Sequence, residues 1–186
     1  VFHVSARTVS THALNIFGDH SDVMACRQTG FAMLCEGNVQ EVMDLSPVAH
    51  LAALSGKVPF INFFDGFRTS HEIQKIAVWD YKDLADMCDM DAVKAFREHA
   101  LNPEHPAMRG SHENGDTFFQ HREACNQYYD ALPEVVEKYM GKINEKLGTD
   151  YKLFNYYGAP DADRVIIAMG SICDVAEEVI DYLNAH

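Results

Sequence analysis

The stretch NVQEVMDLSPVAHLAALSGKVPFINFF, residues 38–64, decides the fold. Its first part places apolar residues at helical spacing, and Asn38 followed by Glu41 matches a capping box at a helix start. Gly56 stands where the left-handed residue after a helix is expected. Residues 58–64 then form a continuous apolar run, which is typical of a buried strand. The stretch therefore predicts a helix followed directly by a buried strand.

The first residues of the chain extend this pattern. VFHVSA, residues 1–6, has the alternation and β-branching of a strand. Strand, long helix and strand in succession predict a parallel sheet with flanking helices, the α/β class. We expect further helix at 80–100 and 133–147, short helix at 12–17 and within 21–34, and a long irregular loop at 101–116.

A second apolar run lies near the end of the chain. DRVIIAMGS, residues 163–171, predicts a buried strand and a turn, with a helix from about Cys173. This is the pattern of a first βα unit, so we expect a second α/β domain at 158–186 after a first domain at 1–157. Because the chain starts in a strand and stops in a helix, we also expect an internal segment of a longer polypeptide.

Composition excludes several classes of function. The chain of 186 residues is 47% hydrophobic and 23% charged, as in a folded globular protein. A net charge of -13 disfavours nucleic acid and anionic membranes as partners, and no apolar run is long enough to span a bilayer. The acidity predicts a solvated surface or, alternatively, a docking face for a basic partner. The five cysteines have no metal-ligand spacing, and with no signal peptide they indicate a reducing, cytoplasmic location.

Arg7 is the principal candidate for a functional residue. It follows the first strand, and ligands of open α/β sheets bind beyond the carboxyl ends of the strands. A guanidinium group can hold a carboxylate through two parallel hydrogen bonds, so Arg7 is a candidate anchor for a 2-oxo acid. The alternative is a structural salt bridge. Leu14 and Ile16 either wall a small pocket for the substrate methyl group or belong to the ordinary core.

Two loops carry further polar residues: Gly18-Asp19-His20 and the run FFDGFRTSHE at 63–72. In the second loop, Asp65-Gly66 with Thr69-Ser70 indicates a capped turn that supports the Arg7 loop. For the polar side chains of both loops we favour such structural hydrogen bonds over metal binding or acid–base chemistry: Asp19, His20, Asp22, Asp65, Arg68 and His71.

Several runs of this sequence resemble the pyruvate:ferredoxin (flavodoxin) oxidoreductases. The longest are HVSAR at 3–7, IFGDHSDVMACRQTGFAML at 16–34 and FFDGFRTSHEIQKI at 63–76. Shorter matches extend the resemblance over essentially the whole chain: NPEHP at 102–106, YKLF at 151–154 and GAPDA at 158–162. Since members of this family are many times longer, the resemblance implies a segment of such an enzyme.

The resemblance implies a partial pyrimidine-type domain of a thiamine diphosphate enzyme, in which Arg7 falls on the arginine that binds the substrate carboxylate. The family converts pyruvate and coenzyme A to acetyl-CoA and CO2 and passes electrons to ferredoxin or flavodoxin. Its cofactors are thiamine diphosphate, Mg2+ and [4Fe-4S] clusters, whose main ligands we expect outside this segment. The full enzyme is expected to be a homo-oligomer in anaerobic metabolism, and the isolated segment to be inactive. Two alternatives remain open: an enzyme for another 2-oxo acid, and a stand-alone acidic α/β binding module.

Overall fold

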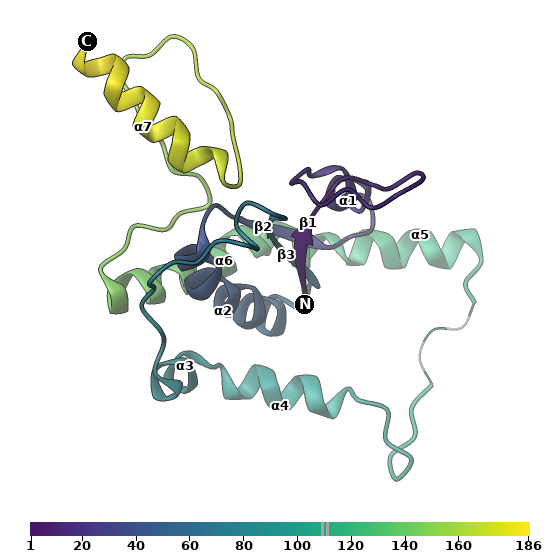
Figure 1. Cartoon of the computed structure of the whole chain (residues 1–186). Helices are drawn as coiled ribbons and strands as arrows, with labels where there is room; N and C mark the ends of the chain where they lie inside the picture. Colours follow the sequence, from purple (N-terminus) through teal and green to yellow (C-terminus); the bar gives the residue numbers. More distant parts are fainter. Residues whose placement is uncertain (109, 111) are drawn as a thin grey trace.

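The computed structural model describes residues 1–108, 110 and 112–186 (Figure 1). Three parallel strands form one sheet in the order β1-β3-β2: β1 (Phe2–Ala6), β2 (Ala32–Glu36) and β3 (Phe60–Asp65). The central position of β3 explains its continuous apolar run, because both faces of a central strand are covered. The α/β class with a small parallel sheet and flanking helices is thereby confirmed.

The helices in the described part of the chain are α1 (Ser21–Ala25), α2 (Val39–Gly56), α3 (Tyr81–Met87), α4 (Met90–Glu98), α5 (Gly115–Ala124), α6 (Asn126–Leu147) and α7 (Ile172–Ala185). Helices α1, α2 and α6 lie at the sheet, whereas α3, α4, α5 and α7 extend away from it (Figure 1). Among the described helices, none combines the length and the apolar character that a membrane crossing requires.

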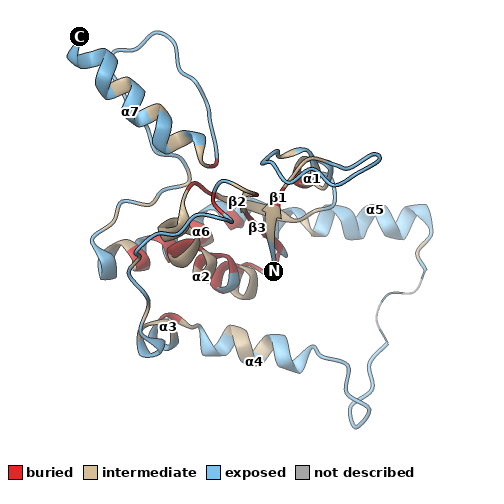
Figure 2. Cartoon of the chain, viewed as in Figure 1, coloured by how far each residue is buried: buried red, intermediate tan, exposed pale blue. Residues whose placement is uncertain are grey.

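The main core lies between the sheet, α2 and α6. Phe60 of β3, Val48 of α2, and Tyr139 and Ile143 of α6 are all fully buried there. Figure 2 shows the same distribution, with buried residues concentrated in α2, α6 and the strands, while α4, α5 and α7 are mostly exposed. The core therefore holds the sheet from one side and leaves its carboxyl edge to the loops.

The two ends of α2 show how local sequence determines the crossover. The Asn38 side chain accepts from the Glu41 N–H at 3.0 Å, which confirms the predicted cap, and Glu41 reaches back to the N–H of Gly37. The predicted role of Gly56 is wrong. Lys57, with φ of 57°, takes the left-handed conformation, whereas Gly56 ends the helix where a side chain would collide with Leu132 of α6.

A smaller apolar cluster covers the opposite face of the sheet. It combines Ala6 of β1, Val23 of α1, and Ile61 and Phe63 of β3, all of them buried. The ring of His20 lies edge-on to the ring of Phe63 at 5.4 Å. This cluster anchors the loop after β1 at the carboxyl end of the sheet.

Several predicted boundaries differ from the structure. The helix expected at 80–100 is two helices, because Asp89 caps a new start by accepting from the Ala92 N–H at 3.0 Å. Helix α6 begins seven residues before Pro133, which lies within it. No helix forms at 12–17. The loop expected at 101–116 is irregular except for the start of α5, although residues 109 and 111 lie outside the described residues.

The strand predicted within 163–171 is absent, whereas the helix after it is confirmed as α7. Ile166 is 92% exposed, and its neighbours Val165 and Ile167 are also exposed. A strand is stable only when its backbone groups pair with a neighbour, and no strand of the described chain lies beside this run. The apolar sequence predicts a strand, but the pairing that would form it is missing here.

Candidate functional site at the carboxyl end of the sheet

Arg7 lies at the carboxyl end of β1, as predicted. Its backbone N–H donates to Oδ2 of Asp22 at 2.9 Å, and a β-bridge joins its backbone to Gly18. Before it, Ala6 pairs in register with Asp65 of β3, and the N–H of Gly66 donates to the carbonyl of Ala6 at 2.8 Å. The backbone at Arg7 is therefore fixed from both sides.

The guanidinium group of Arg7 contacts neutral oxygens. Its Nε donates to the carbonyl of Ile16 at 3.1 Å, and Nη2 lies 3.4 Å from the hydroxyl of Ser70. Among the described residues, Arg7 forms no ion pair, so the structural salt bridge weighed above is not found there. The guanidinium group is therefore held in place by uncharged partners.

The side chain of Arg7 crosses the backbone of the next strand at Gly66. A Cβ atom at Gly66 would lie 2.5 Å from Cγ of Arg7 and 2.5 Å from the carbonyl oxygen of Ala6. Contacts that short are sterically forbidden, so only glycine lets Arg7 adopt this position. Gly66 therefore leaves room for the side chain of Arg7, in addition to its place in the turn.

The polar residues of the two loops form the structural hydrogen bonds favoured above. Oδ1 of Asp19 accepts from the N–H of Ser21 at 2.5 Å, and the ring of His71 contacts the hydroxyl of Ser70 at 2.9 Å. His20 contacts Asp65 at 2.5 Å, whereas Arg68 is exposed. Together the contacts join the loop after β1 to the turn after β3.

Leu14 and Ile16 differ in their relation to Arg7. Ile16 reaches Arg7 through its carbonyl, and its side chain is 41% exposed. Leu14 is 82% exposed, so the alternative that it belongs to the ordinary core is wrong. A pocket wall made of these two side chains therefore stays a prediction.

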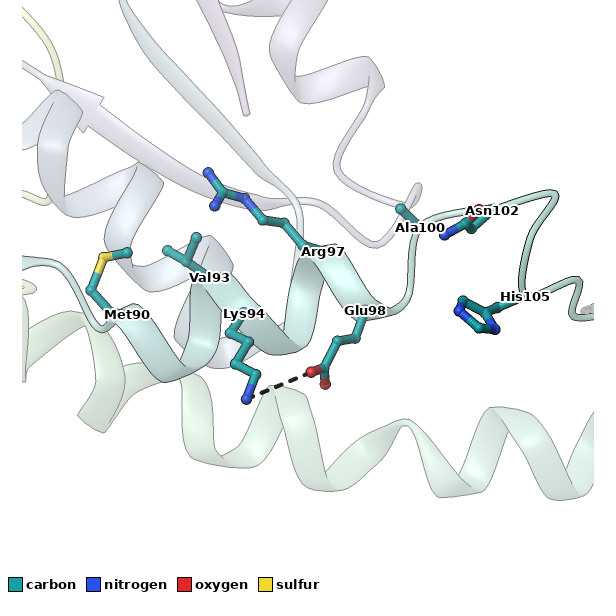
Figure 3. Close-up of a pocket in the computed structure, with 8 residues that line it drawn as sticks. All are labelled: Met90, Val93, Lys94, Arg97, Glu98, Ala100, Asn102 and His105. Carbon is teal, nitrogen blue, oxygen red and sulfur yellow. Dashed lines mark ion pairs between the residues drawn. The ribbon is translucent and has the colours of Figure 1, made fainter.

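Two of the cavities that the described residues line lie elsewhere in the molecule. One, of about 500 Å³, lies along α4 and the loop after it. Figure 3 shows residues that line it, among them Lys94 paired with Glu98. The second lies between α2 and α4 and reaches Val1 and Pro59, at the amino ends of the strands. Neither is lined by Arg7, Leu14 or Ile16, so neither extends the candidate site.

Glu36 is a buried acidic residue that the sequence did not point to. It is the last residue of β2 and is fully buried, and neither carboxyl oxygen has a hydrogen-bond partner. Burial raises the pKa of Glu36 to about 9, against a smaller lowering effect of Asn62. The carboxyl group is therefore neutral at pH 7. An acidic residue that ends an apolar run, as in AMLCE, was the available signal, but β2 itself had not been predicted.

Comparison with known proteins gives a consistent result. Residues 1–141 match the family model described as pyruvate flavodoxin/ferredoxin oxidoreductase, thiamine diphosphate-binding. The chain is 64% identical over 185 residues to a pyruvate-flavodoxin oxidoreductase of Enterobacter agglomerans, covering 100% of the chain and 16% of that protein. It is 61% identical over 183 residues to the pyruvate:ferredoxin oxidoreductase of Moorella thermoacetica, covering 98% and 16%.

A third relative has a different name and also matches nearly the whole of this chain. The pyruvate dehydrogenase [NADP(+)] of Cryptosporidium parvum is 50% identical over 183 residues, which are 98% of this chain and 10% of that protein. All three relatives are thus many times longer than the segment they share with this chain. Their names have pyruvate in common and differ in the electron acceptor.

Proposed function

Since this chain belongs to the pyruvate flavodoxin/ferredoxin oxidoreductase family, we propose that it is the part of a pyruvate-oxidising enzyme that binds the substrate carboxylate, with Arg7 as the binding residue. Family membership confirms the resemblance noted in the sequence. The proposed reaction is the oxidative decarboxylation of pyruvate with coenzyme A to acetyl-CoA and CO2, with electrons passing to ferredoxin or flavodoxin.

One observation carries the assignment of Arg7. Its guanidinium lies at the ligand edge of the sheet with only neutral hydrogen-bond partners among the described residues. A carboxylate can therefore bind without displacing a protein carboxylate. Two parallel N–H donors hold it and also fix its plane, which determines where the adjacent 2-oxo carbon points.

The relatives' names support pyruvate over another 2-oxo acid. The relatives named for flavodoxin, ferredoxin and NADP(+) share this segment at 50% identity or more, and pyruvate is the substrate that all three names contain. A segment common to all of them is expected to serve the common substrate. Membership in an oxidoreductase family likewise favours an enzyme segment over a stand-alone binding module.

The described residues do not by themselves fit the cofactors of the family. They contain no group of three His, Cys, Asp or Glu side chains that could hold Mg2+, and the five cysteines form no cluster site. Glu36 has the right chemistry to contact a pyrimidine nitrogen, but the residue is fully buried, so neither of its oxygens is open to a ligand from solvent. We propose that thiamine diphosphate, Mg2+ and [4Fe-4S] clusters are held by other parts of a full-length enzyme, which we expect to be homo-oligomeric.

A chimera tests the proposed function. The host enzyme is the Enterobacter agglomerans relative with its 185 matching residues replaced by this chain. We expect the host enzyme to oxidise pyruvate with coenzyme A at a rate within about tenfold of its parent, a difference of about 1.4 kcal/mol in barrier. The isolated 186-residue chain is expected to show no turnover. Pyruvate oxidation by the isolated chain, or a folded but inactive host enzyme, would contradict the proposal.

Substitution of Gly66 with Ala tests the geometry around Arg7. The new methyl group would overlap Cγ of Arg7 and force the side chain away from its position. In the host enzyme, the KM for pyruvate is expected to rise about tenfold or more, since a displaced guanidinium loses charge-assisted hydrogen bonds to the substrate. Steady-state kinetics measure the effect.

Gly141→Ala is the matched control, because a Cβ atom at Gly141 on α6 meets nothing within 4 Å. We expect the KM of this variant to equal that of the host enzyme. An unchanged KM in folded Gly66→Ala would show that the position of Arg7 does not matter for substrate binding.

A further inference from the structure

The carboxylate of Asp65 joins segments that are far apart in sequence. Its Oδ1 accepts from Nε2 of His20 at 2.5 Å, and its Oδ2 accepts from the N–H and hydroxyl of Ser171 at 2.9 and 2.5 Å. These three residues, called the Asp65 clamp below, connect the loop after β1, the end of β3 and the start of α7. In Figure 1 the first turn of α7 accordingly lies close to the carboxyl end of the sheet.

The approach of the α7 turn to Asp65 is very close. Gly170 has φ of 81°, and a Cβ atom there would lie 2.7 Å from Oδ1 of Asp65. A side chain at this position would therefore collide with the carboxylate. The Gly170-Ser171 pair is suited to hold this carboxylate: glycine allows the approach, and serine supplies two donors.

The two groups that contact the Arg7 guanidinium, the Ile16 carbonyl and the Ser70 hydroxyl, lie in segments that are hydrogen-bonded to Asp65. Ile16, whose carbonyl accepts from Nε, belongs to the loop that His20 ties to the Asp65 carboxylate. Ser70, which contacts Nη2, lies in a turn whose N–H groups at 69 and 70 both donate to the Asp65 carbonyl at 3.2 Å. One residue thus holds the two supports of Arg7, one through its side chain and the other through its backbone.

We propose that Asp65 is a positioning residue for substrate binding: its carboxylate closes the clamp with His20 and Ser171 and thereby holds Arg7 in the orientation that grips the substrate carboxylate. This inference rests on the proposed function of Arg7. It also gives the start of α7 a role in substrate binding, because Ser171 supplies two donors to the Asp65 carboxylate. Ser171 lies 164 residues after Arg7 in the chain.

The ionisation of Asp65 is consistent with this role. Burial raises the pKa of Asp65, but the hydrogen bonds from Ser171 and His20 outweigh burial, so that the pKa lies below its usual value. The carboxylate therefore remains charged at neutral pH and acts as a strong acceptor. Asparagine would keep the shape but lose the charge and one acceptor oxygen.

The test compares Asp65→Asn with Arg7→Lys in the host enzyme. We expect Asp65→Asn to raise the KM for pyruvate about tenfold and to leave kcat within about twofold, because the positioned group acts in binding. In the double variant the KM is expected to equal that of Arg7→Lys alone, since Asp65 acts through Arg7. A merely structural role predicts that the two effects multiply, and this outcome would overturn the proposal.

Two further variants keep the test decisive. Ser171→Ala removes one donor of the clamp without touching β3, and we expect a smaller rise in KM; this variant serves if Asp65→Asn fails to fold. Asp174→Asn is the matched control, because Asp174 accepts from the side chain of Asn38, the N-cap of α2, and lies outside the clamp. Its KM is expected to stay unchanged.

The outcomes separate the two proposals. If Arg7→Lys raises KM while Asp65→Asn and Ser171→Ala leave it unchanged, the clamp proposal is wrong and the function of Arg7 stands. If Arg7→Lys leaves KM unchanged, the proposed function fails and the clamp proposal fails with it. If Asp174→Asn raises KM as much as Ser171→Ala, the effect comes from the general attachment of α7 and the clamp proposal is again wrong.

Discussion

Replacing Arg7 with Met in the host enzyme is expected to raise the KM for pyruvate about 100-fold, which corresponds to about 3 kcal/mol of lost charge-assisted hydrogen bonding. Methionine keeps most of the length and the packing against Gly66 but has no donor. Arg7→Lys keeps the charge and loses the planar pair of donors, so about tenfold is expected. Steady-state kinetics over a range of pyruvate concentrations separate KM from kcat.

Arg68→Met is the control for this experiment. Arg68 lies in the turn after β3, close to Arg7 in the fold, but its side chain is exposed and has no hydrogen bond or ion pair in the described structure. We expect its KM to stay within about twofold of the host enzyme, as for surface substitutions in general. A fall in kcat with an unchanged KM in Arg7→Met would show that Arg7 does not bind the ground-state substrate.

Glu36→Gln is expected to stabilise the chain at neutral pH. The carboxyl group of Glu36 has a pKa of about 9 in the folded chain and of 4.5 when unperturbed. Between these values the folded state holds a proton that the unfolded state releases, so the free energy of unfolding falls as pH rises from 4.5 towards 9. From pH 4.5 to pH 7 the loss is about 3 kcal/mol, at about 1.4 kcal/mol for each pH unit.

Glutamine removes this loss because it is neutral in both states. Like protonated Glu36, glutamine places no charge in this buried position, where both oxygens of Glu36 lack a hydrogen-bond partner. We therefore expect wild type and Glu36→Gln to converge near pH 4.5 and to diverge as the pH rises.

Urea unfolding of the 186-residue chain, followed by the fluorescence of Trp79, measures the difference at each pH. Trp79 is the single tryptophan and packs against the main core, so its emission reports on unfolding. Glu137→Gln, at an exposed position on α6, is the control and is expected to follow wild type at every pH. A stability gap between wild type and Glu36→Gln that does not change with pH would contradict the neutral, buried state of Glu36.

The sequence predicts well what depends on local periodicity and capping. The helix that begins after Asn38 and the apolar strand that follows it are both present, because each is encoded by its own residues. The position of Arg7 follows from the same logic, since a residue directly after a parallel strand lies at the ligand edge of the sheet. These features need no knowledge of distant contacts.

Features that depend on distant contacts could not be predicted. β2 has five residues with no clear alternation, and only its pairing with β3 makes it a strand. The apolar run around Ile166 shows the converse, because it has strand-like residues and no partner. The bond between Asp65 and Ser171 joins residues 106 positions apart, and neither local sequence indicates the other. The exposure of Leu14 depends on how the loop after β1 folds, and the residues around Leu14 do not indicate that fold.

The most direct measurement of the central claim is a crystal structure of the host enzyme with pyruvate bound. We predict the pyruvate carboxylate on Arg7, with two N–H···O distances of about 2.7–2.9 Å. The contacts of Arg7 with Ile16 and Ser70 should orient the guanidinium in that complex. A pyruvate carboxylate bound to other residues, with Arg7 still on Ile16 and Ser70 alone, would contradict the account.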